Sequence, residues 1–464
     1  MRHPTRSLPA TLALLATVAY LAVAPLLAYP ASAHDGSRAL QLALLAVVSL
    51  LAVAGSVGLR ATAPDSLKAC ALAALAIALP SLLAAPNRAA AAQEIALMLG
   101  LAVLALQVCH AARGNAIGWA YDGLLAGSCT YFLLTTGIYG VALLDAGAGP
   151  LNARLLHLGF DNPRFFNHVQ TLALPVLLGW SVAAPDRLRR RAASVAASLH
   201  FAWLFMDVAR ASLLALAVAT VWCCWVGARP LWRRLLLCAL AGFVIHWVLF
   251  VALPIALGRS WFTHFAGLQE LTSSHSRDLL LSAALDLIRD HPWLGAGPMH
   301  FAALAHPKGA HPHNLYLQWA AEFGLPSLLL LVAVLAIPLW RASALLRQTR
   351  SQSPAMTAAL SAALLAALVD AGFSGNFVMP LSQVWIAVTY GLLLAALPIG
   401  LAVTTPLRTG LRRLALAGLL ASQVWLCAVA WHQWQHIPPR ISDLSPITTA
   451  DQKPRPRFWQ QGWL

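Results

Sequence analysis

Residues 270–326 read ELTSSHSRDLLLSAALDLIRDHPWLGAGPMHFAALAHPKGAHPHNLYLQWAAEFGLP, a polar stretch in a chain otherwise made of apolar runs. The stretch is too long for a tight turn, and a loop of this length is usually functional or disordered. Apolar residues with helical spacing run through it. We therefore predict that it is folded and that it carries the function of the protein.

The rest of the chain is rich in apolar residues. Of 464 residues, 59% are hydrophobic and 10% are charged, whereas a soluble domain has about 25% charged residues. Runs long enough to approach the roughly 20 residues of a membrane span occur near 8–29, 39–59, 67–85, 94–111, 118–144, 168–184, 192–208, 211–228, 235–257, 325–341, 356–371, 381–401 and 411–431. The predicted fold is an all-α polytopic integral membrane protein with about 12–13 transmembrane helices and one large, partly helical periplasmic loop. The short runs 192–208 and 356–371 leave the count open.

The arginines indicate the orientation in the membrane. The net charge is +15, but the basic residues separate apolar runs and do not cluster on one soluble face, so we expect no nucleic-acid partner. Lys and Arg concentrate in cytoplasmic loops, which places the N-terminus inside and the 258–322 loop outside. In a Gram-negative host the protein would be a multi-pass inner-membrane protein with its site facing the periplasm. An odd number of spans puts the tail on the same side, and we expect that tail to be poorly ordered.

These runs divide the chain into four predicted parts. Residues 1–257 form an N-terminal transmembrane bundle, 258–324 the large periplasmic catalytic loop, 325–434 the C-terminal transmembrane helices and 435–464 a polar tail. The seven cysteines fall in apolar segments and show neither a disulfide framework nor zinc-ligand spacing.

Within the loop, residues 276–290 fit a helix at the membrane interface. Asp278, Ser282, Asp286 and Asp290 repeat every four residues and form one polar stripe. Arg277 falls about 100° from this stripe, in line with apolar positions. Two interpretations stay open: a snorkelling arginine at the lipid headgroups, or a phosphate ligand aimed at the membrane surface.

The HPHN sequence at 311–314 is the second candidate. Pro312 blocks a helix before it and Asn314 can cap the helix after it, so His313 is fixed at a helix mouth. Imidazole suits proton abstraction near neutral pH, although a structural histidine fits the pattern too. Histidines 291, 300, 306, 311 and 313 crowd this region, but no carboxylate cluster joins them, so we predict no metal and no cofactor.

Polar residues at the outer ends of earlier spans add further candidates. Arg210 lies between two apolar runs, where an arginine is costly unless paired or functional, and Asp207 is in reach on a helix. Arg164, Asn167, His168 and Gln170 open the sixth span and either line a substrate cleft or cap a helix. Asp370 and Asn376 are weaker candidates.

Three motifs resemble the superfamily of O-antigen ligases, O-antigen polymerases and protein O-oligosaccharyltransferases. ARASLL supplies Arg210, with Ala209 where the family usually has Ser. HPWLGAG at 291–297 ends the helix that begins near Arg277. HNLYLQWAAEFG carries His313 with Leu317, Glu322 and Gly324 at the family's spacing. The resemblance covers about residues 190–330.

The resemblance implies a metal-independent membrane glycan transferase. Its donor would be a glycan on a polyprenyl diphosphate, and its acceptor a hydroxyl of lipid A core in lipopolysaccharide biosynthesis, of a pilin-type protein Ser/Thr, or of another glycan. Guanidinium groups match a diphosphate leaving group, and a base must take the acceptor proton. The residues expected to act are the catalytic His313, Arg210 and Arg277, and the substrate-binding Arg164, Asn167, Gln170, His311, Asn314 and Glu322.

Two alternatives stay open. A metal-dependent polytopic glycosyltransferase needs acidic residues in an early external loop, and the first such loop offers only Asp35. A transporter of lipid-linked sugars needs charged residues buried within its spans, whereas most charges here fall at the ends of the apolar runs.

Overall fold

The computed structural model describes most of the chain. The described residues are 7–27, 29, 32–55, 65–114, 117–145, 150–151, 156–261, 275–303, 309–349, 354–398, 409–436 and 457–459. The α-helices are α1 (Leu8–Val23), α2 (Ala33–Ala54), α3 (Asp65–Ala84), α4 (Arg88–Gly114), α5 (Gly118–Leu144), α6 (Pro163–Ala183), α7 (Arg187–Met206), α8 (Arg210–Trp225), α9 (Arg229–His246), α10 (Leu253–Ala256), α12 (His275–Asp290), α13 (Leu315–Phe323), α14 (Leu325–Gln348), α15 (Ala355–Ala371), α16 (Pro380–Ala396) and α17 (Thr409–Trp434). The short helical segments are η1 (Ala24–Leu26), η3 (Trp247–Ala252) and η4 (His300–Ala303).

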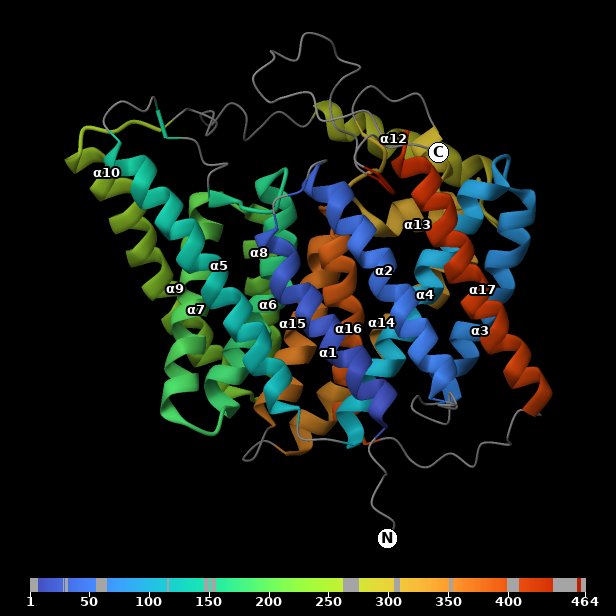
Figure 1. Cartoon of the computed structure of the whole chain (residues 1–464), viewed down its shortest axis with the longest axis horizontal. Coiled ribbons are helices and arrows are strands. Elements are labelled where there is room, and N and C mark those ends of the chain that lie inside the picture. The colour runs from blue at the N-terminus through green and yellow to red at the C-terminus, as the bar shows by residue number, and fades with distance from the viewer. Residues whose placement is uncertain are drawn as a thin grey trace.

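The long helices stand side by side, and α12 and α13 lie at one end of them, opposite the N-terminus (Figure 1). Within the described residues there is no strand, only one isolated bridge between Leu151 and Trp261. The predicted all-α polytopic fold is confirmed. Each of the predicted apolar runs falls on a helix, because a backbone in lipid must satisfy its hydrogen bonds internally.

Seven helical segments are long and apolar enough to cross a membrane on their own. They are Leu8–Leu26, Ala33–Ala54, Arg88–Arg113, Gly118–Leu144, Arg229–Ala256, Leu325–Gln348 and Leu414–Trp434. Three shorter helices, α8, α15 and α16, are also apolar. The chain is therefore a multi-pass membrane protein, while the exact number of spans stays a prediction.

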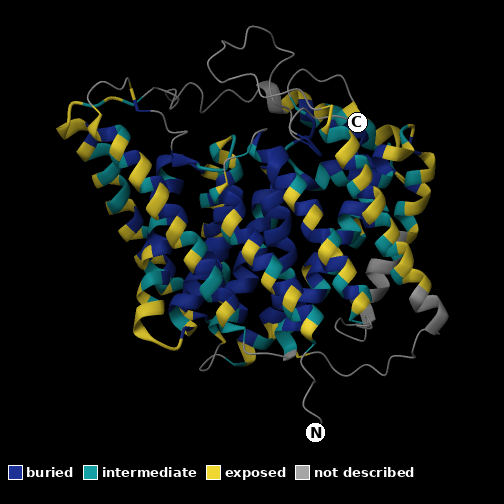
Figure 2. Ribbon diagram, viewed as in Figure 1, coloured by how far each residue is buried: buried dark blue, intermediate teal, exposed yellow. Residues whose placement is uncertain are grey.

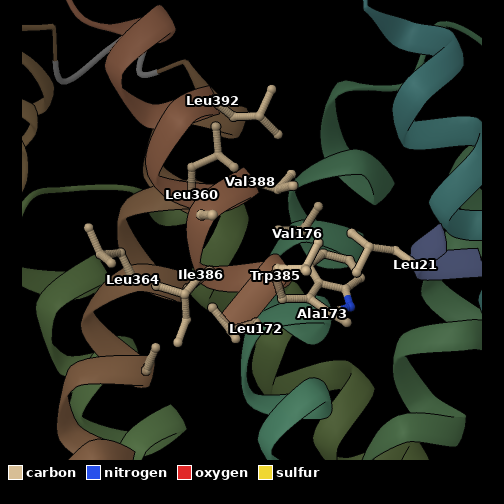
Figure 3. Close-up of a cluster of buried hydrophobic side chains, with 14 of the residues drawn as sticks. Leu21, Leu172, Ala173, Val176, Leu360, Leu364, Trp385, Ile386, Val388 and Leu392 are labelled. Carbon is tan, nitrogen blue, oxygen red and sulfur yellow. The ribbon is translucent and has the colours of Figure 1, made fainter. Parts of the chain in front are cut away.

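Small side chains let the central helices approach one another closely. In α15 the alanines at 358, 359, 362, 363, 366 and 367 are all buried, and this helix packs against α6 and α8. Close packing of small residues is the usual basis of helix association in membranes. Larger side chains fill the remaining space: Leu172 and Val176 of α6, Leu360 of α15 and Trp385 of α16 belong to one buried cluster (Figure 3).

The distribution of buried and exposed residues also fits a membrane protein. Buried residues fill the middle of the helix assembly, and exposed residues lie on its outer helices (Figure 2). Many of those exposed residues are large and apolar, such as Leu133 at 74% and Val141 at 73% exposure. A soluble protein rarely shows such broad apolar surfaces, and here they match the lipid that surrounds a polytopic protein.

Candidate functional site

The loop before α13 has the geometry that the HPHN sequence predicts. Helix α13 begins at Leu315, and the Oδ1 atom of Asn314 accepts a hydrogen bond from the N–H of Leu317 at 3.0 Å. The predicted cap is confirmed. The Nδ2 atom of Asn314 also donates to the carbonyl of Gly372 at 3.0 Å, which ties the start of α13 to the turn after α15.

His311 and His313 form a close pair at this helix mouth. The N–H of His313 donates to Nδ1 of His311 at 3.3 Å, and the ring centroids lie 4.1 Å apart. His311 is buried, and burial, reinforced by the nearby His313 and Arg457, holds its pKa well below the ordinary value. A neutral ring that accepts at Nδ1 carries its proton on Nε2. His313 is only half-buried, so its ring is the more accessible of the two.

Three residues other than glycine have positive φ among the described residues: Val208 at 50°, Met299 at 69° and His313 at 53°. For residues other than glycine this region is uncommon, and each such residue costs on the order of 1–3 kcal/mol. Met299 lies between α12 and α13 in the chain, and Val208 lies between α7 and α8. Strained residues of this kind gather at functional sites, which makes this end of the molecule the candidate site.

The corner between α7 and α8 holds Arg210. Its N–H donates to the carbonyl of Val208 at 2.8 Å, and its side chain is exposed at the first position of α8. The guanidinium of Arg164 donates to the carbonyls of Asp207 at 3.2 Å and Val208 at 3.3 Å. Arg164 and Arg210 therefore flank one strained corner, as expected for residues at the outer end of neighbouring spans.

Asn167 and Gln170 follow Arg164 on α6, and both side chains are buried. The Oδ2 atom of Asp207 accepts from Asn167 at 2.7 Å and lies 2.9 Å from Nε2 of His157. Asn167 also donates to Gln170, and Gln170 donates to the carbonyl of His200 at 2.9 Å. The structure thus places both amides in a polar network that joins α6 to the end of α7.

A second polar group lies beside His311 and includes Asp370, one of the weaker candidates from the sequence. The Nδ1 atom of His168 lies 3.1 Å from Oδ2 of Asp370, and the hydroxyl of Ser374 donates to the same oxygen at 2.7 Å. A Cβ atom on Gly375 would lie 2.5 Å from Cε1 of His311. The GFSGNF turn at 372–377 is therefore shaped around the buried histidine, and its glycine spacing was the available signal.

The HPWLGAG motif packs on the end of α13. The N–H groups of Ala296 and Gly297 donate to the carbonyls of Ala321 and Glu322 at 2.8 and 3.1 Å. Gly295 and Gly324 both have positive φ. A Cβ on Gly295 would lie 2.2 Å from the backbone of Glu322, and one on Gly324 would lie 2.2 Å from the carbonyl oxygen of Trp293. The two glycines allow the backbone of the HPWLGAG motif to cross closely over the backbone at the end of α13.

The carboxylate of Glu322 lies at the centre of this crossing. Its Oε1 atom accepts from the N–H of Phe301 at 3.1 Å, and its Oε2 atom accepts from the guanidinium of Arg457 at 2.6 Å. Both side chains are 1% exposed. Burial raises the pKa of Glu322 to about 7, and the Arg457 cation opposes that rise.

The contact with Arg457 corrects the prediction that the C-terminal tail is poorly ordered. The tail was predicted to be poorly ordered, but Arg457–Trp459, here named the C-terminal segment, is buried against the helices. The guanidinium of Arg38 in α2 donates to the carbonyl of Phe458 at 3.0 Å. The prediction is wrong for this segment because buried donors and a buried carboxylate bind it. Since Glu322 belongs to α13, the segment lies at the same end as the large loop, as expected.

Arg277 is located only by its backbone. It lies in the first turn of α12, and its side chain is outside the described residues. The helix packs through Leu280 and Ala284 on Phe301 of η4. The predicted polar stripe is exposed at all four positions, namely Asp278, Ser282, Asp286 and Asp290.

Other features of the described residues are less suited to glycan transfer. A pocket between α1, α5, α6, α7 and α16 is lined mainly by apolar side chains such as Leu21, Tyr131 and Trp385, and the only imidazole that lines it is that of His200. Among the described residues, no group of three or more His, Cys, Asp or Glu side chains is arranged to hold a metal ion. Metal independence stays a prediction.

Comparison with known proteins relates the chain to one family. No curated protein matches it. Residues 195–332 match the family model described as O-antigen ligase. The matched segment contains Arg210, the HPWLGAG motif and the HN motif with His313. The members of this family are membrane enzymes that transfer glycosyl groups. Residues 195–332 of the chain are therefore similar to the O-antigen ligase family, in agreement with the resemblance that the sequence motifs indicate.

Proposed function

We propose that the protein transfers a glycan from a polyprenyl-diphosphate carrier to an acceptor hydroxyl on the periplasmic face of the inner membrane, in the manner of an O-antigen ligase. His313 takes the acceptor proton. The freed oxygen attacks the anomeric carbon, and the bond from that carbon to the diphosphate breaks. The polyprenyl diphosphate leaves with the electron pair. Arg210 and Arg277 bind the diphosphate, whose negative charge grows in the transition state.

One observation carries the assignment of His313. Its backbone is held in a strained conformation by the N–H bond to His311 and by the cap at Asn314, while its ring stays half-exposed. A general base must be held within reach of the proton that it takes. A strained and fixed backbone that presents an accessible imidazole meets this requirement.

The remaining candidates divide by burial. Arg164 is exposed beside the corner that carries Arg210, so we assign it to substrate binding. Asn167, Gln170, His311 and Glu322 are buried and bonded within the protein, and Asn314 caps α13. We propose that these five support the site by fixing its backbone and its arginine corner, since each of them already makes a hydrogen bond within the protein.

Transfer by purified protein tests the proposal. The protein in lipid nanodiscs would receive a polyprenyl-diphosphate-linked glycan together with lipid A core, a pilin-type peptide or a free glycan as acceptor. We expect transfer to lipid A core, and a deletion strain should lack the glycan on its lipopolysaccharide. Transfer only to the peptide or to the glycan would move the protein to one of the other branches, and no transfer to any acceptor would refute the proposal.

A fusion experiment tests the orientation. Alkaline phosphatase fused after Gly309 should be active, because the enzyme folds only outside the cytoplasm and the Lys/Arg pattern places this loop outside. An active β-galactosidase fusion at the same position would place the loop in the cytoplasm and contradict the assignment.

A further inference from the structure

The C-terminal segment contacts four helices that are distant in the sequence. Trp459 donates from Nε1 to Gln433 of α17 at 2.8 Å. The carbonyl of Phe458 accepts from Arg38 of α2 and lies 3.3 Å from Nε2 of His34. Arg457 reaches α4 and α13 through carboxylates. Each of the three residues is at most 2% exposed, so the segment is packed as part of the site end of the molecule.

Arg457 joins the two halves of the catalytic loop. Its Nη2 atom lies 2.6 Å from Oε2 of Glu322 and 3.4 Å from Oε1 of Glu94, and its Nε atom lies 3.4 Å from the sulfur of Met299. Met299 is one of the strained residues, and Glu322 lies near the end of α13. One guanidinium therefore fixes both the turn after α12 and α13, the helix that follows His313.

The segment also satisfies a buried arginine of the core. Arg38 is 1% exposed, and its guanidinium donates to the carbonyls of Arg457, Phe458 and Val378 and to the side chains of Gln41 and Gln383. Every one of these acceptors is uncharged. A buried cation that loses acceptors bears a large desolvation cost, so the C-terminal segment and α2 depend on each other.

Arg457 influences the histidine pair in two ways: its charge affects the pKa of His311, and its contact with Glu322 holds α13. Burial lowers the pKa of His311 well below its ordinary value, with smaller contributions from His313 and Arg457, and His311 accepts the hydrogen bond that fixes the backbone of His313. Both routes, one through Glu322 and α13 and one through His311, end at the proposed base.

We infer that Arg457 is a positioning residue for the transfer reaction and that the C-terminal segment is a working part of the site. The inference rests on the proposed function, because it assigns Arg457 an effect on the step in which His313 takes the acceptor proton. A side chain that only stabilised the fold would alter the amount of folded protein and leave the turnover of each folded molecule unchanged.

Turnover and donor KM of Arg457→Ala test the inference. We expect kcat per folded molecule to fall by roughly 10²-fold, since a displacement of about 1 Å at a catalytic group has that effect, while the donor KM changes little. Arg457→Lys should recover much of the loss because it keeps the cation beside Glu322. Arg289→Ala is the matched control: Arg289 is 77% exposed and pairs with Asp286 on the surface of α12, so its kcat should stay at the wild-type value.

A double variant protects the test against misfolding. Removing one member of a buried pair leaves a lone charge, so Arg457→Ala alone can fail to fold. Arg457→Ala/Glu322→Gln removes both charges of the 2.6 Å pair and leaves only the more distant Glu94, at 3.4 Å, without its cation, so it should fold. It should still show the lower kcat because the link to Met299 and α13 is gone. A wild-type kcat in either folded variant would overturn the inference.

Labelling with diethyl pyrocarbonate separates this inference from the proposed function. His311 is buried and neutral in the wild type, so it should react slowly, and it should react faster in the double variant. This readout needs no glycan transfer. If the wild type transfers no glycan, the proposed function fails and the labelling of His311 decides whether Arg457 fixes the loop; unchanged labelling would overturn that role.

Discussion

The guanidinium of Arg457 and the carboxylate of Glu322 are in contact at 2.6 Å, although 135 residues separate them in the sequence. Both side chains are buried, and the contact joins the end of the chain to the helix that follows His313. An ionisable pair this deeply buried makes the site end of the protein sensitive to pH.

Glu322 should give the folded protein a measurable pH dependence. Its pKa is raised from 4.5 to about 7 by burial, so the folded protein binds this proton more tightly than the unfolded chain does. The contribution to stability is therefore complete below about pH 4.5 and is lost as the pH rises through about 7. Its size is on the order of 3 kcal/mol, since one pKa unit corresponds to about 1.4 kcal/mol.

Thermal unfolding in detergent measures this effect. The Tm of the wild type should fall relative to that of Glu322→Gln as the pH rises from about 5 to about 8. The glutamine variant resembles the protonated carboxyl and does not titrate, so it serves as the reference. Parallel Tm curves for the two proteins would show that Glu322 does not titrate in this range.

Much of the fold could be predicted from apolar run length, because a span needs its own hydrogen bonds and about 20 apolar residues. The cap at Asn314 and the helix LYLQWAAEF were equally predictable, since capping depends on neighbours in the sequence. For the same reason the glycines at 295 and 324 could be noticed as motif positions. Their function, a close backbone crossing, needed the structure.

The long-range parts of the site could not be predicted. Nothing in the tail sequence indicates that Arg457 inserts beside Glu322, because the partner is far away in the chain. The pairing of His168 with Asp370 spans 202 residues and has the same origin. The positive φ of His313 also escaped prediction, since φ at such a position depends on the hydrogen bond to His311 and on packing.

Gly375→Ala should disturb the histidine pair. The added Cβ would lie 2.5 Å from Cε1 of the buried His311 ring, and a buried ring has little room to move. We expect transfer to fall by about tenfold or more, since small displacements at a site are costly. Gly372→Ala is the control in the same turn, because its Cβ would lie 3.3 Å from the carbonyl oxygen of Val369 and 3.8 Å from the Tyr316 ring, and would not approach His311. Equal activity in the two variants would contradict the proposed packing.

Arg210→Lys and Arg277→Lys should each lower the transfer rate, although lysine keeps the positive charge of arginine. A guanidinium binds a diphosphate with two parallel hydrogen bonds, and lysine cannot reproduce that geometry. A hydrogen bond to a charged group contributes roughly 1.5–3 kcal/mol, so we expect about a ten- to hundredfold loss in rate. Arg289→Lys on the exposed face of α12 should retain full activity. Wild-type rates in the first two variants would assign them to lipid anchoring.

Transfer should persist after metal is removed with EDTA. The proposal places positive charge from arginine side chains at the diphosphate, where a metal-dependent enzyme would use a divalent cation. The measurement is the transfer rate of purified protein before and after dialysis against the chelator. Loss of transfer that Mg²⁺ or Mn²⁺ restores would favour the metal-dependent glycosyltransferase.

His313→Ala should be folded and nearly inactive. A positioned general base contributes about 10²–10⁴-fold to the rate, and alanine removes the imidazole. The substitution also leaves the Asn314 cap in place, so the fold should survive. Binding of the lipid-linked donor should persist as well, because the base touches the acceptor and the diphosphate binds to arginines. Transfer assays, donor binding and a thermal-unfolding control measure these three outcomes separately. His436→Ala, a change of an exposed histidine at the end of α17, should leave all three unchanged. A well-folded His313→Ala protein with full transfer activity would remove His313 from the mechanism and direct attention to His168, which is buried and paired with Asp370.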